Sequence, residues 1–221
     1  MKNNFLFGYP QQCVRCASLS SSRIELRVIP HYKQGGNLRV MLIGQDPTIL
    51  RKPERVKEVL MLDESNGKLS RWLKQIFGDD NFHTITLYAT NLVKCSFVKP
   101  PSSSAGGSLK FLKPYFDNCK EYLAHELLSF KPDCVLTLGE PAHTLFITML
   151  DNQMPDTMQA AFTGQFLRAK FRGIEFDYSP CLHIQSFRVA EVYGERVQKF
   201  KDGISSYFKS NDGTSQNKEA G

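Results

Sequence analysis

The sequence RVMLIGQDPT, residues 39–48, joins a short apolar run to a polar turn that carries a carboxylate. An uninterrupted apolar run of this length is typical of a strand that is buried on both faces. Similar runs lie at residues 86–91, 134–139 and 174–178, with helical patterns between them. Because strands that alternate with helices form βαβ units, the sequence predicts an α/β fold: a three-layer α/β/α sandwich with a mainly parallel, roughly four-stranded central sheet.

Helical patterns fill the intervals between these runs. The clearest one places apolar residues at i, i+3, i+4, i+7 and i+8 on one face: Leu69, Trp72, Leu73, Ile76 and Phe77. A second helix is expected to end before Lys131, a third to begin near Pro141, and a last one to cover residues 189–208. The Pro-, Ser- and Gly-rich stretch at residues 100–108 predicts a surface loop.

Length and composition limit the class of protein. Of the 221 residues, 41% are hydrophobic and 23% are charged, which excludes a wholly disordered or collagen-like chain. We expect one domain over residues 1–209, with an N-terminal arm at residues 1–20, and a disordered tail over residues 210–221. No run approaches the ~20 apolar residues of a membrane helix, and no secretory signal precedes the domain. These features predict a cytoplasmic monomer without a membrane partner.

The charge balance is basic, because 28 Lys and Arg residues stand against 22 Asp and Glu residues and leave a net charge of +6. Such an excess attracts polyanions, although it is smaller than that of a purely electrostatic nucleic-acid binder. The charge therefore permits a nucleic-acid partner without establishing one.

Polar residues follow three of the four apolar runs. Gln45 and Asp46 come directly after the first run, Asn91 ends the second, and His183 follows shortly after the fourth. In open α/β sheets ligands bind beyond the carboxyl ends of the strands, so a carboxylate, an amide and an imidazole would meet at one edge. Taken singly, Asp46 could cap a turn and His183 could be an ordinary loop residue. Their joint placement favours a site.

Four of the six cysteines are candidate metal ligands. Cys13 and Cys16 form a C-x-x-C pair, which suits zinc, an iron-sulfur cluster or a redox dithiol. The pair does not follow a strand, and this disfavours the dithiol. Cys95 comes shortly after Asn91 and Cys119 is expected to open the next helix, so the four thiolates could meet if the arm folds back. Ligation by sulfur alone suits both zinc and a 4Fe-4S cluster.

Several of these segments resemble the uracil-DNA glycosylase superfamily, particularly its iron-sulfur branch, usually called family four. Cys13-x-x-Cys16 resembles the amino-terminal cysteine pair of that branch, and Thr90-Asn-Leu-Val-Lys-Cys95 resembles its third-ligand segment. Cys119-Lys-Glu-Tyr-Leu and the sequence KPDCVLTLGEPA, residues 131–142, resemble the fourth ligand and the strand after it. Gly44-Gln-Asp-Pro47 is instead similar to the first catalytic motif of family-one enzymes.

The resemblance implies an enzyme that hydrolyses the N-glycosidic bond of uracil, or of a related deaminated base flipped out of DNA, in base excision repair. Asp46 would face the positive charge on the sugar and orient water, and His183 would donate to O2 of the departing base. Asn91 would read the O4 and N3–H edge. Further substrate contacts implied by the resemblance are Gly44, Gln45, Pro47, Thr48 and Leu62. The implied cofactor is a 4Fe-4S cluster, with zinc as the alternative, on Cys13, Cys16, Cys95 and Cys119.

The chain departs from the family pattern at three positions and in one spacing, because the 23 residues between Cys95 and Cys119 are more than the family usually has. Thr48 stands where family-one enzymes have a Tyr that excludes the thymine methyl group, which predicts a broader base preference. Leu62 falls near the place of the aromatic that stacks on uracil. His183-Ile-Gln-Ser186 lacks the Pro of the family's His-Pro-Ser motif.

Basic and apolar side chains near these motifs are candidate DNA contacts. Those adjoining the two motifs are Arg51, Lys52, Phe187 and Arg188, and the resemblance adds Ser186 as a phosphate contact. Arg168, Lys170 and Arg172 alternate in an expected hairpin and could form a phosphate surface. For Phe187 a place in the core is an equal alternative.

Two other functions remain open from the sequence. A nucleic-acid-binding protein could keep this fold with little or no base excision, which the changes at Thr48, Leu62 and Ser186 would explain. A zinc-stabilised hydrolase acting on a small nucleotide would cleave free deoxyuridine without DNA.

Overall fold

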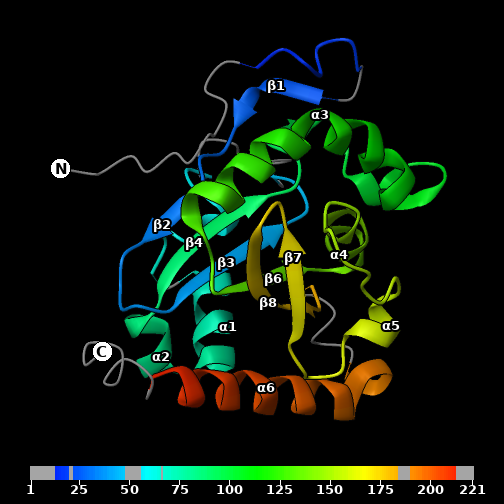
Figure 1. The fold of residues 1–221 in the computed structure, drawn as a ribbon. Helices are drawn as coiled ribbons and strands as arrows, with labels where there is room; N and C mark the ends of the chain where they lie inside the picture. Colours follow the sequence, from blue (N-terminus) through cyan, green and yellow to red (C-terminus); the bar gives the residue numbers. More distant parts are fainter. Residues whose placement is uncertain (1–12, 20–21, 48–55, 66, 184–189, 213–221) are drawn as a thin grey trace.

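A six-stranded mixed sheet forms the centre of the computed structural model, which describes residues 13–19, 22–47, 56–65, 67–183 and 190–212 (Figure 1). Its strands, in spatial order, are β2 (His31–Lys33), β4 (Thr86–Asn91), β3 (Arg39–Gly44), β6 (Cys134–Leu138), β8 (Ile174–Cys181) and β7 (Leu167–Phe171). The inner strands β4, β3, β6 and β8 are parallel, whereas β2 and β7 are antiparallel to their neighbours. The expected sheet is therefore wrong in strand number and in being mainly parallel, since both edges are antiparallel additions.

The inner strands are buried on both faces, as their apolar runs predict. In β3, Val40 and Leu42 belong to one core cluster, and Met41 and Ile43 belong to the other. Successive side chains of a strand point to opposite faces, so a continuous apolar run is what a strand between two helical layers requires.

Helices cover both faces of the sheet, which gives the three layers that the sequence predicts (Figure 1). One face is covered by α3 (Gly107–Phe130) and α4 (Glu140–Ile147), and the other by α1 (Lys68–Phe77), α2 (Asp79–Thr84) and α6 (Ala190–Asp212). The short α5 (Met158–Ala161) precedes β7. Every helix in the described ranges is too short or too polar to traverse a lipid bilayer.

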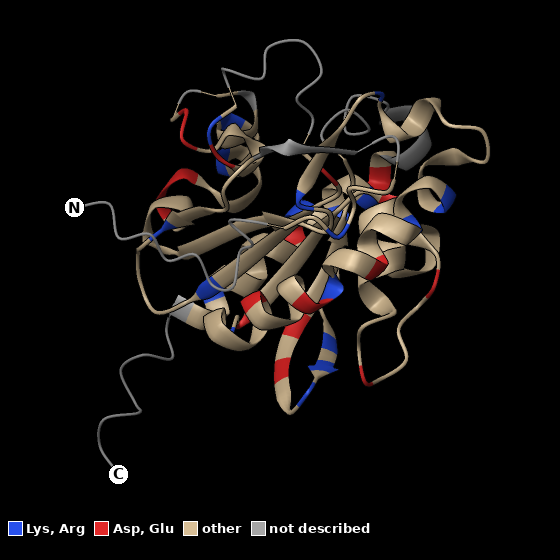
Figure 2. Cartoon of the chain, turned by 90° about the horizontal axis from the view of Figure 1, so that it is seen from above, with Lys and Arg blue, Asp and Glu red and all other residues tan. Residues whose placement is uncertain are grey.

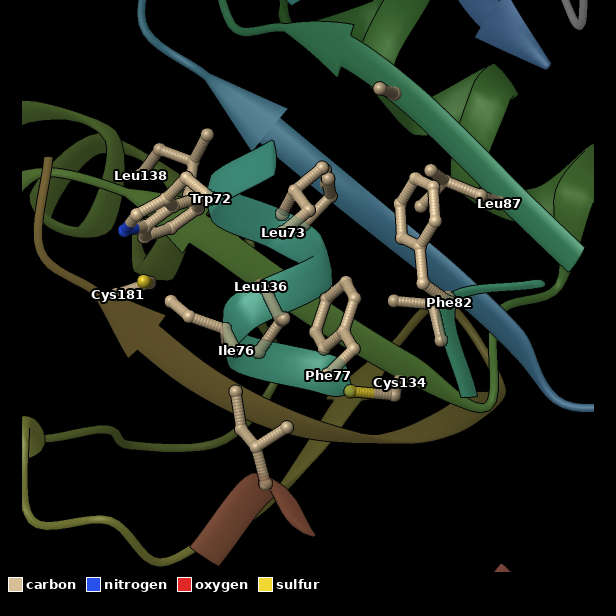
Figure 3. Packing of buried hydrophobic residues seen from close by; sticks show 14 of the residues in the cluster. Trp72, Leu73, Ile76, Phe77, Phe82, Leu87, Cys134, Leu136, Leu138 and Cys181 are labelled. Carbon is tan, nitrogen blue, oxygen red and sulfur yellow. The ribbon is translucent and has the colours of Figure 1, made fainter. Parts of the chain in front are cut away.

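Helix α1 shows how its sequence pattern becomes packing (Figure 3). The predicted face, with Trp72, Leu73, Ile76 and Phe77, lies against the sheet, and each of these side chains is buried. Cys134 and Cys181 lie in the same cluster. Burial raises the pKa of both thiols, so they are protonated core residues.

The region before α3 differs from the expected loop. A short helix η3 (Pro101–Ser103) is followed directly by α3, which begins at Gly107. Cys119 therefore lies inside α3 rather than at the start of a helix. A separate two-stranded sheet pairs β1 (Ser22–Arg27) with β5 (Cys95–Phe97). At the other end of the chain, α6 continues to Asp212, and residues 213–221 lie outside the described residues.

Candidate functional site

The ends of β3 and β4 meet at one edge of the sheet. Gly44, the last residue of β3, is the register partner of Asn91, the last residue of β4. Beyond the strands, the N–H of Leu92 donates to Gly44 O at 2.9 Å and the N–H of Val93 donates to Gln45 O at 3.1 Å. The segment that carries Gln45 and Asp46 is thus tied to the segment that follows Asn91, as the positions of the apolar runs predict.

Gly44 and Asn91 approach so closely that a side chain at residue 44 would displace that of Asn91. A Cβ atom there would collide with Oδ1 of Asn91 and would lie 3.2 Å from Cδ2 of Leu60. The Asn91 side chain is 2% exposed, and its Oδ1 has no hydrogen-bond partner in the described part of the chain. Because an unsatisfied buried acceptor costs about 1–3 kcal/mol, this oxygen is suited to receive a hydrogen bond from a ligand.

Asp46 is a partly buried carboxylate beside this edge. The side-chain amide of Gln45 donates to its Oδ1 at 2.7 Å. Burial raises the pKa of Asp46 to about 6, and the hydrogen bond from Gln45 acts against this rise. A carboxyl with a pKa close to neutrality can serve as a base or as a charge that forms near physiological pH.

His183 lies at the same edge, two strands from β3. The N–H of Gly139, after β6, donates to the O of Cys181 at 2.7 Å, and His183 follows two residues later. Its Cβ is 3.5 Å from the point where a Cβ of Gly139 would stand. The order β3-β6-β8 puts this strand end roughly 10 Å from that of β3, at about 4.8 Å per strand. His183 is exposed, but partial loss of water around the ring lowers its pKa, which favours the neutral imidazole.

Leu60 is the apolar residue that the structure places beside Gly44. It belongs to the short helix η2 (Val59–Met61), and its backbone is left-handed, with φ of 62°. This conformation is unfavourable for a side chain with a Cβ, and no sequence pattern announces it. Leu62, the expected stacking position, is 6% exposed and belongs to the core cluster that α1 joins.

The N-terminal arm docks on α3 through residues next to the cysteines. The Arg15 guanidinium donates to the O of Asn118 at 3.2 Å and lies 4.7 Å from the centre of the Tyr122 ring. In return, Nδ2 of Asn118 donates to the O of Arg15 at 3.1 Å and to Sγ of Cys16 at 3.4 Å. The arm therefore folds back onto α3, the helix that carries Cys119.

All four candidate ligands are buried near one another. Burial, with smaller contributions from the neighbouring Cys16 and Cys95, raises the pKa of the Cys119 thiol to about 12, and Lys94 acts against this rise. A hydrogen bond with Cys13 raises the pKa of Tyr122, one turn after Cys119 on α3. In the described ranges, however, no group of three or more Cys, His, Asp or Glu side chains stands in an arrangement that could hold a metal ion. The segments that carry the four cysteines lie close together, but in the described residues their side chains do not form a metal-binding arrangement.

A family model for the uracil DNA glycosylase superfamily matches residues 30–193, about three quarters of the chain. The chain belongs to the uracil DNA glycosylase superfamily. Asp46, Asn91 and His183 all lie inside the matched range, whereas Cys13 and Cys16 precede it. None of the curated proteins compared with the chain matches it. The matched range therefore includes the strand-end site. It does not show to which branch of the superfamily the chain belongs.

Several residues that the superfamily resemblance singles out lie outside the described residues. These are Thr48, Arg51, Lys52, Ser186, Phe187 and Arg188. Pro47 is described and buried, directly after Asp46. The expected roles of these six residues and of Pro47 in a glycosylase stay predictions.

The hairpin β7–β8 does not offer this superfamily member a free basic surface. Arg168 bonds to Glu175 and Asp177, both at 3.2 Å, and Lys170 lies 3.1 Å from Glu175. Arg172 pairs with Glu121 of α3 at 2.9 Å. Figure 2 shows the basic and acidic residues side by side along the hairpin. Acidic neighbours on the partner strand and on α3 therefore offset the positive charge of the expected phosphate surface.

Proposed function

We propose that this chain is a DNA glycosylase that hydrolyses the N-glycosidic bond of uracil, or of a related deaminated base, flipped out of DNA. The observation that carries the proposal is the buried Oδ1 of Asn91, which has no partner in the described part of the chain and lies against Gly44 at the strand-end edge. Superfamily membership supports the same activity.

Asn91 would recognise the base. A carboxamide presents one acceptor oxygen and an NH₂ donor, so Oδ1 can accept from the N3–H of uracil while Nδ2 donates to its O4. Cytosine offers the opposite pattern at these two positions. Binding a uracil edge would satisfy the buried oxygen, whereas a mismatched edge would leave polar groups unpaired, and that penalty is the source of selectivity.

Asp46 and His183 would act on opposite charges. As the bond from the sugar C1′ to the base nitrogen breaks, its electron pair leaves with the base and positive charge develops on the sugar. The Asp46 carboxylate, which has a pKa of about 6, is ionised at neutral pH and stabilises that charge. It also orients the water whose oxygen bonds to C1′ and accepts the proton that this water loses. His183, whose lowered pKa keeps it neutral, donates an N–H to O2 of the base as negative charge gathers there.

The cysteine group would hold a 4Fe-4S cluster, with zinc as the alternative. Four buried thiols from the arm, β5 and α3 fit such a centre in ligand type and in burial. When bound, the centre would tie the arm to the sheet edge and would take no part in bond cleavage. The protein supplies the docking contacts itself, through Arg15 and Asn118.

The test is a panel of duplex and single-stranded oligonucleotides that carry uracil, hypoxanthine or xanthine, scored for abasic sites. We expect abasic sites at uracil, and their loss in Asp46→Asn serves as the control. DNA binding without abasic sites on any substrate would overturn the proposal in favour of a non-catalytic nucleic-acid-binding protein. Cleavage of free deoxyuridine in the absence of DNA would overturn it in favour of a small-nucleotide hydrolase.

A further inference from the structure

An ion pair is buried completely between β4 and α3, beneath the strand-end site. Lys94 is 2% exposed and Glu126 is 0% exposed, and the Nζ of Lys94 lies 2.6 Å from Oε2 of Glu126. Taking two charges out of water is costly, and well-packed apolar residues of similar size often stabilise a fold as well or better. The pair therefore calls for an explanation other than stability.

Every donor of the ammonium group is used. Besides the bond to Glu126, Nζ donates to Oγ1 of Thr90 at 2.6 Å and to the main-chain O of Asn91 at 2.7 Å. Glu126 in turn accepts from the hydroxyl of Tyr88 at 3.0 Å and from Thr90 at 3.1 Å. Full burial raises the pKa of Glu126, and the Lys94 ammonium acts against that shift. The network has a single rigid arrangement, because each polar group has its partner.

This network ends at the residue that would read the base. The Nζ of Lys94 donates to the main-chain O of Asn91, and the side chain of Asn91 lies against Gly44. On the other side, the main-chain N–H of Lys94 bonds to the thiol of Cys119. Lys94 therefore stands between the base-reading amide and the cysteine group, and Glu126 anchors it to α3, which crosses this face of the sheet (Figure 1).

We propose that Lys94 and Glu126 are positioning residues for Asn91: they fix its main chain at the end of β4 and so set the direction in which its amide meets a base. This proposal rests on the proposed glycosylase function. It adds a structural origin for the selectivity between bases. Neither residue touches the substrate. Loss of the pair should therefore change the choice of base edge more than it changes the stability of the fold.

The decisive variant is Lys94→Met combined with Glu126→Gln, which removes both charges together and keeps an acceptor for Tyr88 and Thr90. The matched control is Arg172→Met with Glu121→Gln, which removes an exposed ion pair that also has its carboxylate on α3. Two quantities are measured: the NMR signals of the Asn91 side-chain amide, and the ratio of single-turnover excision rates for uracil and 4-thiouracil. The first needs no activity, and the second tests recognition at O4.

We expect the buried double variant to melt within a few degrees of the wild type and to shift or broaden the Asn91 amide signals. It should also lose about tenfold in the uracil preference, which is less than the roughly hundredfold that a misplacement by about 1 Å can cost. The control should change neither quantity. Unchanged Asn91 signals with an unchanged preference would overturn the proposal. If the wild type excises no base, the proposed function is wrong. The amide signals alone then test whether Lys94 and Glu126 position Asn91.

If the double variant does not fold, Tyr88→Phe provides the second variant, because it removes one hydrogen bond to Glu126 and changes no charge. It should shift the Asn91 amide signals in the same direction by a smaller amount. A folded Tyr88→Phe protein with the wild-type signals would overturn the proposal.

Discussion

Among single residues, Asp46 carries the clearest chemical consequence. Burial raises the pKa of its carboxyl from 3.8 to about 6. The folded protein therefore binds this proton more tightly than the unfolded chain does, so the free energy of unfolding falls as the pH rises from about 4 to about 6. Above that range the cost of the buried charge is about 3 kcal/mol, at about 1.4 kcal/mol per pKa unit.

We expect Asp46→Asn to slow single-turnover excision by on the order of hundredfold, because a neutral amide cannot stabilise positive charge on the sugar. The same change should raise the free energy of unfolding at pH 8 by up to about 3 kcal/mol and have little effect at pH 4. In the wild type, kcat/KM should rise with pH up to about 6. Urea unfolding at both pH values and a pH–rate profile measure these effects. A variant rate within about twofold of the wild type, far below the usual donor or charge effect, would remove Asp46 from catalysis.

Gly44 is the second residue with a sharp expectation. In Gly44→Ala the added methyl group collides with Oδ1 of Asn91, so that side chain must move. We expect at least about a tenfold loss of excision rate with the fold retained, since small displacements in a site have effects of this size. The control is Gly194→Ala on α6, where the methyl group meets open space. Equal rates for Gly44→Ala and the wild type would show that the position of Asn91 does not limit the reaction.

Thr48, which lies outside the described residues, is expected to decide how large a group at C5 of the base can enter. A short branched side chain in place of a ring leaves room for a methyl group or a larger one. Thr48→Tyr should therefore narrow acceptance of 5-substituted uracils. Relative excision rates for uracil, 5-hydroxymethyluracil and thymine measure the change. The same relative rates in both proteins would contradict the role of Thr48.

Sequence patterns locate Gly44, Asp46 and Asn91 at strand ends because apolar runs stop visibly there. They do not locate Leu60, since a left-handed backbone at a leucine opposes its propensity and is imposed by tertiary contacts. They also miss Lys94 and Glu126, because Lys and Glu side chains are usually exposed. Burial of that pair depends on partners up to 38 residues apart in the chain.

At the level of helices and strands, apolar runs predict the four inner strands and miss both edges, although the alternation of Arg168, Lys170 and Arg172 predicts the hairpin that contains β7. Strand β2 has only three residues, His31–Lys33, and β7 alternates exposed and buried residues in a hairpin with β8. Helix α3 begins earlier than expected because Gly106 and Gly107 suggest a loop. Their positive φ values, 93° and 80°, instead form the turn that starts the helix.

The docking of the arm on α3 yields a prediction about the cysteine group. Asn118→Ala removes the donor that bonds both to Arg15 and to Cys16, so we expect lower metal content and faster thiol labelling of Cys13 and Cys16. Iron, acid-labile sulfide and zinc are measured per chain after anaerobic purification. Asn211→Ala is the control, because it removes an amide that donates to the O of Tyr207 within α6. A wild type with none of these elements and with all four thiols freely reactive would exclude the centre.

Across the whole molecule, the net charge is +6. The hairpin β7–β8 holds basic residues that acidic neighbours already neutralise, and exposed pairs of this kind add little to stability, about 0–1 kcal/mol each. We therefore expect the electrostatic attraction between the protein and DNA to come from basic residues outside this hairpin.

We expect Arg51→Gln with Lys52→Gln to weaken duplex binding and to reduce the slope of log affinity against log salt by roughly two, at about 0.9 per phosphate contact. Arg168→Gln with Lys170→Gln removes the same charge from the hairpin and should leave the affinity within about twofold, because those side chains are paired. Fluorescence anisotropy at several salt concentrations measures both. Equal losses in the two double variants would mean that net charge, and not location, governs binding.

The contact between Arg15 and Asn118 spans 103 positions in the chain. During synthesis, at about 5–20 residues per second, Cys13 and Cys16 leave the ribosome roughly 5–20 s before α3 is complete. In that interval the two thiols have no helix to dock on and are open to oxidation or to capture by whatever metal is at hand. The arm is made before the helix that it docks on, so any metal that the four cysteines bind would record the redox state and metal supply of the cell that made the protein.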